Sequence, residues 1–334
     1  MRILVIDLLN IGDLLFASPA LRSLREAFPE AKMDMLVKHA VVDTVRHNPN
    51  LDTVIGMDIN GYHKSPAHFW ELIRSLRAER YDKVINLHDS ARSTLIATLC
   101  GANERLGFPS RRFGRLFHHP LKHRGDVHRV DSYLQALNEL GIVTPGPHQM
   151  EMMVDEDSAK CAERKWQDAG LGDRALVIGL NPGARVPMRQ WPPVKWAALA
   201  DKLNASGLGT VVFGGPGETA IGEEIASTAH SDPIVFTGIL SLLELACMTG
   251  KCAVFVSTDT GPLHIAVSQR TPVVALFNPA NPAITGPYSI PHVIVMSNVD
   301  CPGCRGGSPE SHICLASVTV DEVHDGVLRM LGPR

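Results

Sequence analysis

Residues 2–29, "RILVIDLLNIGDLLFASPALRSLREAFP", place a short apolar run directly before a longer run with helical spacing. The first run, Arg2 to Ile6, predicts a strand. The apolar residues of the second run fall on one face of a helix: Leu14, Ala17, Leu21, Leu24 and Phe28. Pro29 lies just past the expected end of this helix. A strand followed by a helix is the repeating unit of a largely parallel α/β sheet.

The same alternation continues along the chain and predicts a sheet in each half. The further expected strands of the first half are Lys32 to Val37, Thr53 to Met57 and Lys83 to Leu87. Those of the second half are Ala175 to Leu180, Thr210 to Phe213, Pro233 to Phe236, Ala253 to Val256 and Val273 to Phe277. Runs such as "AVFV" and "VVALF" lack polar alternation, which is typical of strands covered on both faces.

The alternation lapses at residues 141–157, "GIVTPGPHQMEMMVDED", which are rich in proline, glycine and acids. We place the domain boundary there and expect domains at residues 1–150 and 151–334. One option is that the last helix, about residues 320–334, packs back on the first domain. Two open sheets joined by a linker create a cleft, and ligands bind beyond the carboxyl ends of the strands.

Composition agrees with two globular domains. The chain has 334 residues, 45% of them hydrophobic, 20% charged, with a net charge of −3. No run of ~20 apolar residues predicts a transmembrane helix, and Asp7 and Asp13 interrupt the first apolar stretch, which excludes a signal-peptide pattern. Seven cysteines are an odd number for a disulfide framework. We therefore expect a cytoplasmic monomer without a nucleic-acid partner.

Positive charge gathers between Arg105 and Arg129. This segment interleaves cations with histidines and has almost no acids: Arg111, Arg112, Arg115, Lys122, Arg124, His118, His119, His123 and His128. Such a segment could attract an acidic partner. Charge alone is equally typical of a solvated basic loop.

The residues that follow the first strand carry a glycine and a lone carboxylate, Gly12 and Asp13. The stretch "DLLNIGD" lacks G-x-G-x-x-G spacing, which removes the main support for a nicotinamide-dependent oxidoreductase. An aspartate after glycine is also a common helix cap. Asp13 is therefore a helix cap or a functional carboxylate.

Two loops of the second half combine glycine with charge. In "NPGARVPMRQWPPVKW", Gly183 allows close backbone approach, and positive charge follows at Arg185, Arg189 and Lys195. The alternative is a proline-rich connection whose tryptophans pack on the core and whose cations lie on the surface. In "FGGPGE", Glu218 suits a first helical turn, or accepts hydrogen bonds from ribose or sugar hydroxyls.

The strand at Ala253 to Val256 is followed by "STDTGPLHIAVSQRTPVVALF". Asp259 reads as a cap, and Pro262 falls in the first helical turn, which would leave the amides of Thr260, Gly261 and Leu263 free. Such a helix end binds anions, and a diphosphate suits it. The alternative is that Asp259 only caps and that His264 is an ordinary first-turn residue.

Taken together, four stretches resemble glycosyltransferase family 9, the heptosyltransferases of lipopolysaccharide core assembly. They are "IGDLLFASPALRSLREAFP", "NPGARVPMRQWPPVKWAALADKL", "FGGPGE" and "STDTGPLHIAVSQRTPVVALFNPANP". The resemblance implies a GT-B fold, two Rossmann-like parallel-sheet domains that face each other across a cleft, with acceptor in the first domain and nucleotide sugar in the second. It also implies inverting transfer of heptose from ADP-L-glycero-β-D-manno-heptose to Kdo or heptose of the inner core.

The resemblance assigns roles to the motif residues. Asp13 would be the general base, and Arg189, where the family usually has lysine, would act in catalysis and donor binding. The other expected donor-binding residues are Gly183, Lys195, Glu218, Asp259, Thr260, Gly261 and His264. We expect the acceptor to contact Gly12, Arg111, Arg112 and Arg115. A lipid-linked acceptor implies lipid A-Kdo or a heptosylated core at the inner face of the cytoplasmic membrane.

We expect no cofactor and no metal. The D-x-D string at Asp155 reads as a helix start rather than a Mg²⁺ site. Near the C-terminus, Cys301, Cys304, His312 and Cys314 could hold zinc, although a loop that merely contains thiols is favoured. Two other functions stay open: transfer to another glycan acceptor, and nucleotide-sugar binding without catalysis.

Overall fold

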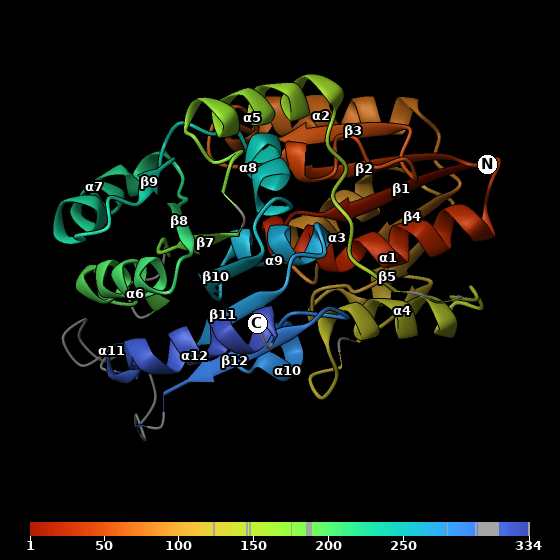
Figure 1. Ribbon diagram of the computed structural model, residues 1–334. Coiled ribbons are helices and arrows are strands. Elements are labelled where there is room, and N and C mark those ends of the chain that lie inside the picture. The colour runs from red at the N-terminus through yellow and green to blue at the C-terminus, as the bar shows by residue number, and fades with distance from the viewer. Residues whose placement is uncertain are drawn as a thin grey trace. The chain divides into compact units, whose positions relative to one another are not determined.

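The computed structural model describes residues 1–122, 124–144, 146, 148–174, 176–184, 189–278, 280–297, 299 and 314–332. The chain divides into two compact units, Met1–Met153 and Val154–Arg334 (Figure 1). Each unit is a parallel sheet between layers of helices, as the alternating pattern predicts.

The sheet of the first unit has six strands, all parallel, in the order β3-β2-β1-β4-β5-β6. Its strands are β1 (Arg2–Asp7), β2 (Lys32–Lys38), β3 (Thr53–Met57), β4 (Lys83–Asn86), β5 (Glu104–Gly107) and β6 (His119–Pro120). The four strands expected from the sequence are confirmed, whereas β5 and β6 were not foreseen. Gly107 ends β5 with φ +106°, where a Cβ would collide with the backbone of Asn86.

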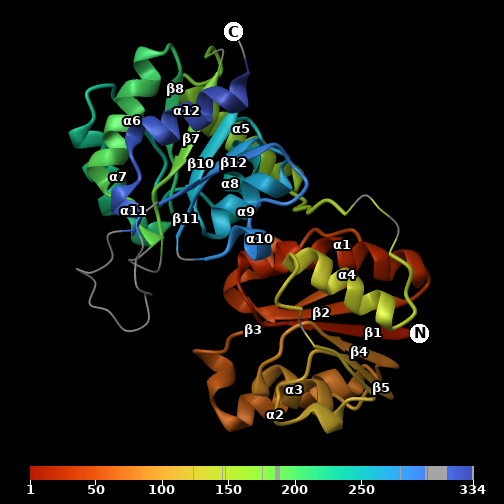
Figure 2. The same ribbon diagram turned by 90° about the horizontal axis from the view of Figure 1, so that it is seen from below.

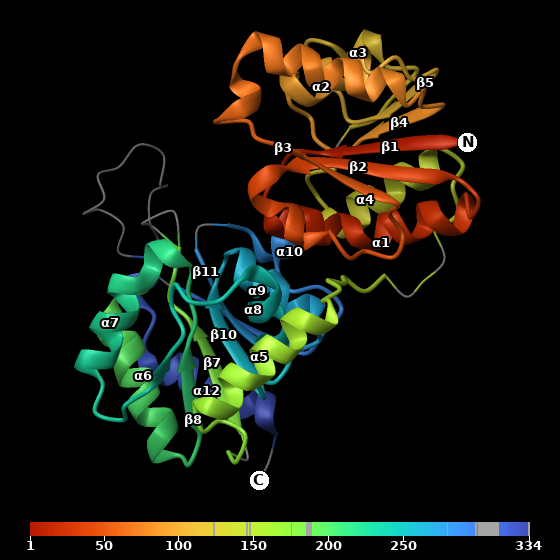
Figure 3. The same ribbon diagram turned by 90° about the horizontal axis from the view of Figure 1, so that it is seen from above.

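Helices cover both faces of this sheet. They are α1 (Ile11–Ala27), α2 (Pro66–Ala78), α3 (Ala91–Leu99) and α4 (Arg129–Glu139), with the short 3₁₀ helices η1 (His39–Thr44), η2 (Tyr62–Lys64) and η3 (Gly114–Leu116). Figures 2 and 3 show α1 and α4 together on one face, with α2 and α3 on the other. Ser65 and Ser90 start α2 and α3, because each hydroxyl accepts a hydrogen bond from an amide of the first turn.

The second unit repeats this topology. Its six parallel strands are ordered β12-β11-β10-β7-β8-β9. They are β7 (Val177–Asn181), β8 (Gly209–Val212), β9 (Ile234–Val235), β10 (Val254–Thr258), β11 (Val273–Phe277) and β12 (His292–Met296). The five expected strands are confirmed within two residues, and β12 was not foreseen.

The helices of the second unit also form two groups. They are α5 (Glu156–Asp168), α6 (Pro193–Ala205), α7 (Thr219–Thr228), α8 (Leu242–Thr249), α9 (Gly261–Ser268), α10 (Pro282–Thr285), α11 (Cys314–Ser317) and α12 (Val320–Leu331), with η5 (Pro216–Glu218). α8 packs between α5 and α9, while α12 packs against α6 and strands β10 to β12 (Figure 3). Asp155 caps α5 through Ser158, which confirms the helix start at the D-x-D string.

Both sheets are doubly wound. In each unit the second and third strands are added on one side of the first strand, and the fourth strand is added on its other side, so the order of the strands reverses there. These reversal points lie between β1 and β4 in the first unit and between β7 and β10 in the second. Open α/β sheets bind ligands beyond the carboxyl ends of the strands at such points. Among the described helices, none is long and apolar enough to cross a bilayer.

Candidate functional site

Asp13 lies at the reversal point of the first unit, in the first turn of the helix that follows β1. Its Oδ2 accepts a hydrogen bond from the amide of Asn10 at 3.3 Å. The Asn10 side chain in turn accepts one from Lys38 Nζ at 3.1 Å. Asp13 is half-buried, and no described residue donates to its Oδ1. The N-cap of α1 is Asn10, so Asp13, as the third helical residue, completes a capping box with one oxygen and leaves the other available to a ligand.

A second carboxyl group, Asp7, ends β1 and is fully buried. Its Oδ1 accepts a hydrogen bond from the amide of Leu9 at 3.0 Å, while Oδ2 has no partner among the described residues. Burial, and then the negative charge of Asp13, raise the pKa of Asp7 to about 8. Asp7 therefore keeps its proton at neutral pH.

His88 follows β4, on the other side of the reversal point. Burial lowers the pKa of its imidazole, although the charges of Asp89 and Asp13 oppose this shift. Asp7, Lys38 and His88 were not predicted from the sequence as site residues. Only the strand order brings the ends of β1, β2 and β4 to one edge.

The residues predicted to contact the acceptor are placed differently from one another. Gly12 adjoins Asp13 in the first turn of α1. Arg111, Arg112 and Arg115 are exposed in and before η3, and within the described chain no contact joins them to Asp13. Arg105 of the same basic segment is structural, because its guanidinium donates to the carbonyls of Leu116 and Ala102.

In the second unit, Arg189 and Asp259 form the central pair. Arg189 Nη1 lies 3.0 Å from Asp259 Oδ2 and also 3.0 Å from the backbone carbonyl of Asp259. His264 Nε2 lies 3.8 Å from Asp259 Oδ1. Asp259 and His264 are buried, whereas the Arg189 side chain is 35% exposed. A guanidinium held this way keeps donor capacity for a phosphate.

The start of α9 differs in detail from the expectation. Its cap position is Thr260 rather than Asp259, whose carboxylate pairs with Arg189 instead. The amide of Leu263 is not free either, because it donates to the carbonyl of Thr260 at 3.1 Å. No described residue accepts from the amides of Thr260 and Gly261, and Pro262 has no amide hydrogen. Two amides, not three, remain for an anion.

Asn181 supports this helix start and was missed by the sequence analysis. Its buried side-chain amide donates to Ser257 Oγ at 3.1 Å and to Thr260 Oγ1 at 3.3 Å, which ties the end of β7 to the end of β10 and to the cap of α9. Its Oδ1 is buried with no partner among the described residues. The available signal in the sequence was its place directly after the apolar run from Ala175 to Leu180 that predicts the strand.

Gly183 and Glu218 meet at the same edge. A Cβ on Gly183 would overlap the Glu218 carboxylate, so any larger residue would displace this carboxylate from its present position. Glu218 Oε2 accepts from the amide of Gly215 at 2.6 Å. The structure therefore brings together the "NPG" and "FGGPGE" motifs, as expected for one ligand site.

The Lys195 side chain contacts the main chain of α11 and of the residue that follows it. Its ammonium donates to the carbonyls of Ala316 at 2.6 Å and Val318 at 2.7 Å. The buried indole of Trp191 donates to the same Val318 carbonyl at 3.1 Å, and Trp191 and Trp196 pack edge to face in the core. The expected packing of the tryptophans is confirmed, and donor contact by Lys195 stays a prediction.

Of the possible zinc ligands, Cys314 lies buried in α11. Cys301, Cys304 and His312 lie outside the described residues, as does Arg185. Among the described residues, no group of three or more potential metal ligands gathers.

Comparison with known proteins decides the family. The pattern of glycosyltransferase family 9 (heptosyltransferase) matches residues 69–313. The chain belongs to glycosyltransferase family 9. This confirms the family predicted from the motifs, and this family 9 protein is accordingly a glycosyltransferase.

Its relatives extend over most of the chain. Lipopolysaccharide heptosyltransferase 3 of Escherichia coli is 29% identical over 292 residues, which cover 83% of this chain and 84% of that protein. A family 9 crystal structure from Veillonella parvula is 28% identical with TM-score 0.91, covering 99% of this chain and 97% of that one. ADP-heptose lipopolysaccharide heptosyltransferase II of Escherichia coli is 24% identical with TM-score 0.80, covering 99% and 98%. The predicted GT-B architecture is confirmed for this family 9 protein.

Proposed function

We propose that this protein transfers heptose from ADP-heptose to Kdo or heptose of the lipopolysaccharide inner core. The observation that carries the proposal is the family match over residues 69–313. Relatives named as lipopolysaccharide heptosyltransferases support the reaction class. The lipid-linked acceptor would bring the protein to the inner face of the cytoplasmic membrane.

Asp13 is the proposed general base. In an inverting displacement its carboxylate takes the proton of the acceptor hydroxyl as that oxygen attacks the anomeric carbon and the bond to ADP breaks. The free Oδ1 and the fixed Oδ2 suit this role. Asp7 keeps its own proton at neutral pH and so adds no second negative charge beside the proposed base.

Residues of the second unit would hold the donor. Arg189, fixed by Asp259, and the amides of Thr260 and Gly261 would stabilise the negative charge that grows on ADP as it departs. Glu218 would accept hydrogen bonds from the ribose hydroxyls. This charge stabilisation uses the protein's own donors, and the proposed reaction requires no metal.

The base is tested by Asp13→Asn, with Glu26→Gln on the exposed face of α1 as a matched control. Loss of the base should lower kcat by about 10²- to 10⁴-fold, while the Kd for ADP-heptose changes little. Near-normal turnover by Asp13→Asn would remove it from the base role.

The acceptor is tested with a panel of truncated cores. Acceptor-dependent release of ADP from ADP-heptose should appear with a core truncated at one particular sugar, and not with cores that are one sugar shorter or longer. Tight donor binding without acceptor-dependent release would favour a binding protein, and turnover only with an unrelated glycan would favour a different transferase.

A further inference from the structure

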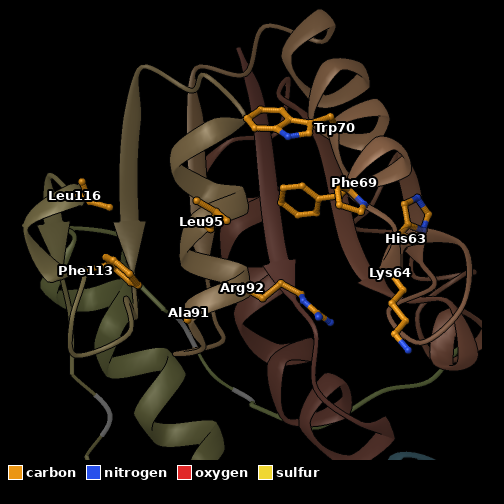
Figure 4. Close-up of a pocket in the computed structure, with 10 residues that line it drawn as sticks. His63, Lys64, Phe69, Trp70, Ala91, Arg92, Leu95, Phe113 and Leu116 are labelled. Atoms are coloured by element: carbon orange, nitrogen blue, oxygen red, sulfur yellow. The ribbon is translucent and has the colours of Figure 1, made fainter.

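A pocket opens on the face of the first unit covered by α2 and α3, which we name the α2–α3 pocket (Figure 4). Its cavity volume is about 490 Å³. Apolar side chains from α2, α3, η3 and the residue before η3 line most of it: Phe69, Trp70, Leu95, Phe113 and Leu116. None of these residues belongs to the motifs that the transferase assignment uses.

The apolar lining is unusually exposed. Trp70 is 50% exposed, Leu95 45%, Phe113 41% and Leu116 40%. Figure 4 shows Phe69 and Leu95 pointing toward each other across the pocket, with Trp70 at one end. Large apolar side chains left in water around one hollow are typical of a ligand or interaction site.

The opposite end of the pocket is cationic. Lys64, just before α2, and Arg92, in the first turn of α3, lie at this end (Figure 4). No described carboxylate pairs with either side chain, and no Asp or Glu is among the described lining residues. Two cations without counter-charges beside an apolar hollow fit a ligand with an anionic head and an apolar tail.

The topology fixes the direction of this polarity. Because α2 and α3 are crossovers of a parallel sheet, both helices begin at the carboxyl edge, where β3 and β4 end. Lys64 and Arg92 therefore lie toward the edge that holds Asp13. Phe69, Trp70 and Leu95 lie about one turn farther along the helices than the two cations, and therefore about 5 Å farther from that edge.

We propose that the α2–α3 pocket binds an acyl chain of the lipid that carries the acceptor, with the lipid's anionic group between Lys64 and Arg92. The identity of this lipid rests on the proposed function. An anionic head near the cations and a chain running away from the edge would leave the sugar part of the acceptor on the side of Asp13.

Tryptophan fluorescence gives a direct test. Trp70 is half-exposed, whereas the other three tryptophans, Trp166, Trp191 and Trp196, are at most 5% exposed. The probe is 12-bromododecanoate below its micelle-forming concentration, because bromine quenches an indole that it touches. We expect saturable quenching of the full-length protein, competed by dodecanoate. Each methylene added to the competitor should raise its affinity about fourfold until the pocket is filled.

Matched probes and variants make the test specific. The neutral 12-bromododecan-1-ol should bind at least tenfold more weakly, because it loses the charge-assisted bonds to Lys64 and Arg92. Leu95→Asp should weaken the bromoacid at least tenfold, while Leu328→Asp, an exposed leucine of α12, should not. Equal binding of acid and alcohol, or unchanged binding to Leu95→Asp with native circular dichroism, would overturn the proposal.

A second measurement assigns the lipid to the acceptor. Wild-type protein should show a lower KM for an acylated acceptor than for its deacylated form. Leu95→Asp should raise the KM for the acylated acceptor, so that the ratio of the deacylated to the acylated KM falls at least tenfold. Equal KM values in the wild type would overturn the assignment. If no acceptor supports transfer, the proposed function fails, and the quenching result alone then decides whether the pocket binds acyl chains.

Discussion

Arg189 is bonded twice to one residue, since its Nη1 lies 3.0 Å from both the carboxylate Oδ2 and the main-chain oxygen of Asp259. The first contact neutralises a buried carboxylate, and the second fixes the guanidinium to the chain that leads into α9. The cation is thereby oriented before any donor arrives, so ordering it costs nothing at the moment of reaction.

Replacing this cation should therefore damage turnover more than folding. We expect Arg189→Gln to lower kcat about 10²- to 10³-fold and Arg189→Lys, which keeps the charge, to recover most of that loss. The unfolding free energy should fall by about 1–2 kcal/mol, because the buried Asp259 loses its partner. Steady-state kinetics and urea unfolding check both effects, with Arg164→Gln on α5 as the control. Equal losses in the lysine and glutamine variants would argue against a phosphate-binding role.

Asp7 should make folding stability depend on pH. Its folded pKa of about 8 lies above the ordinary 3.8, so between these values the folded chain keeps a proton that the unfolded chain has lost. Stability should therefore fall as pH rises through this window, by about 1.4 kcal/mol per unit at the full slope. Asp7→Asn should remove that contribution.

The sharpest comparison lies between pH 6.5 and 8, above the range where His88, whose pKa is lowered, changes its charge. Urea unfolding of the wild type, Asp7→Asn and Glu26→Gln at several pH values gives the slopes. Parallel slopes for the wild type and Asp7→Asn would mean that Asp7 is ionised in the folded protein.

The contact between Gly183 and Glu218 predicts a coupled pair. A methyl group in Gly183→Ala should push the Glu218 carboxylate off the amide of Gly215, at a cost of about 1 kcal/mol. The KM of Gly183→Ala for ADP-heptose should also rise, because the Glu218 carboxylate is displaced. Adding Glu218→Ala should relieve the collision, so that the two stability effects are not additive. Gly217→Ala, where a Cβ meets nothing within 4 Å, is the control.

Metal independence is tested by removing divalent ions. Transfer should continue at an unchanged rate in EDTA, because Arg189 and the helix amides carry the charge of the departing ADP. Loss of activity that Mg²⁺ restores would overturn this mechanism.

The sequence was sufficient wherever one local signal decided the structure. Continuous apolar runs located nine strands, and the glycine and charge motifs located Asp13, Arg189 and Asp259. The missed strands have weaker signals, since β6 has two residues and β5 contains Glu104 and Arg105. Asp259 and Thr260 are both acceptable helix caps, and the pairing of Asp259 with Arg189 decided between them. Asp7, Lys38 and His88 became neighbours only through sheet order.

The Val318 carbonyl accepts hydrogen bonds from both Trp191 and Lys195, and Trp191 is two residues from Arg189. Val318 thus fastens the chain next to Arg189, the cation that we propose holds the donor. Loss of the segment from α11 onward would spare every residue proposed to take part in the reaction and would still remove the Val318 carbonyl that holds Trp191 and Lys195, so we expect proteolysis or a frameshift in this segment to inactivate the enzyme.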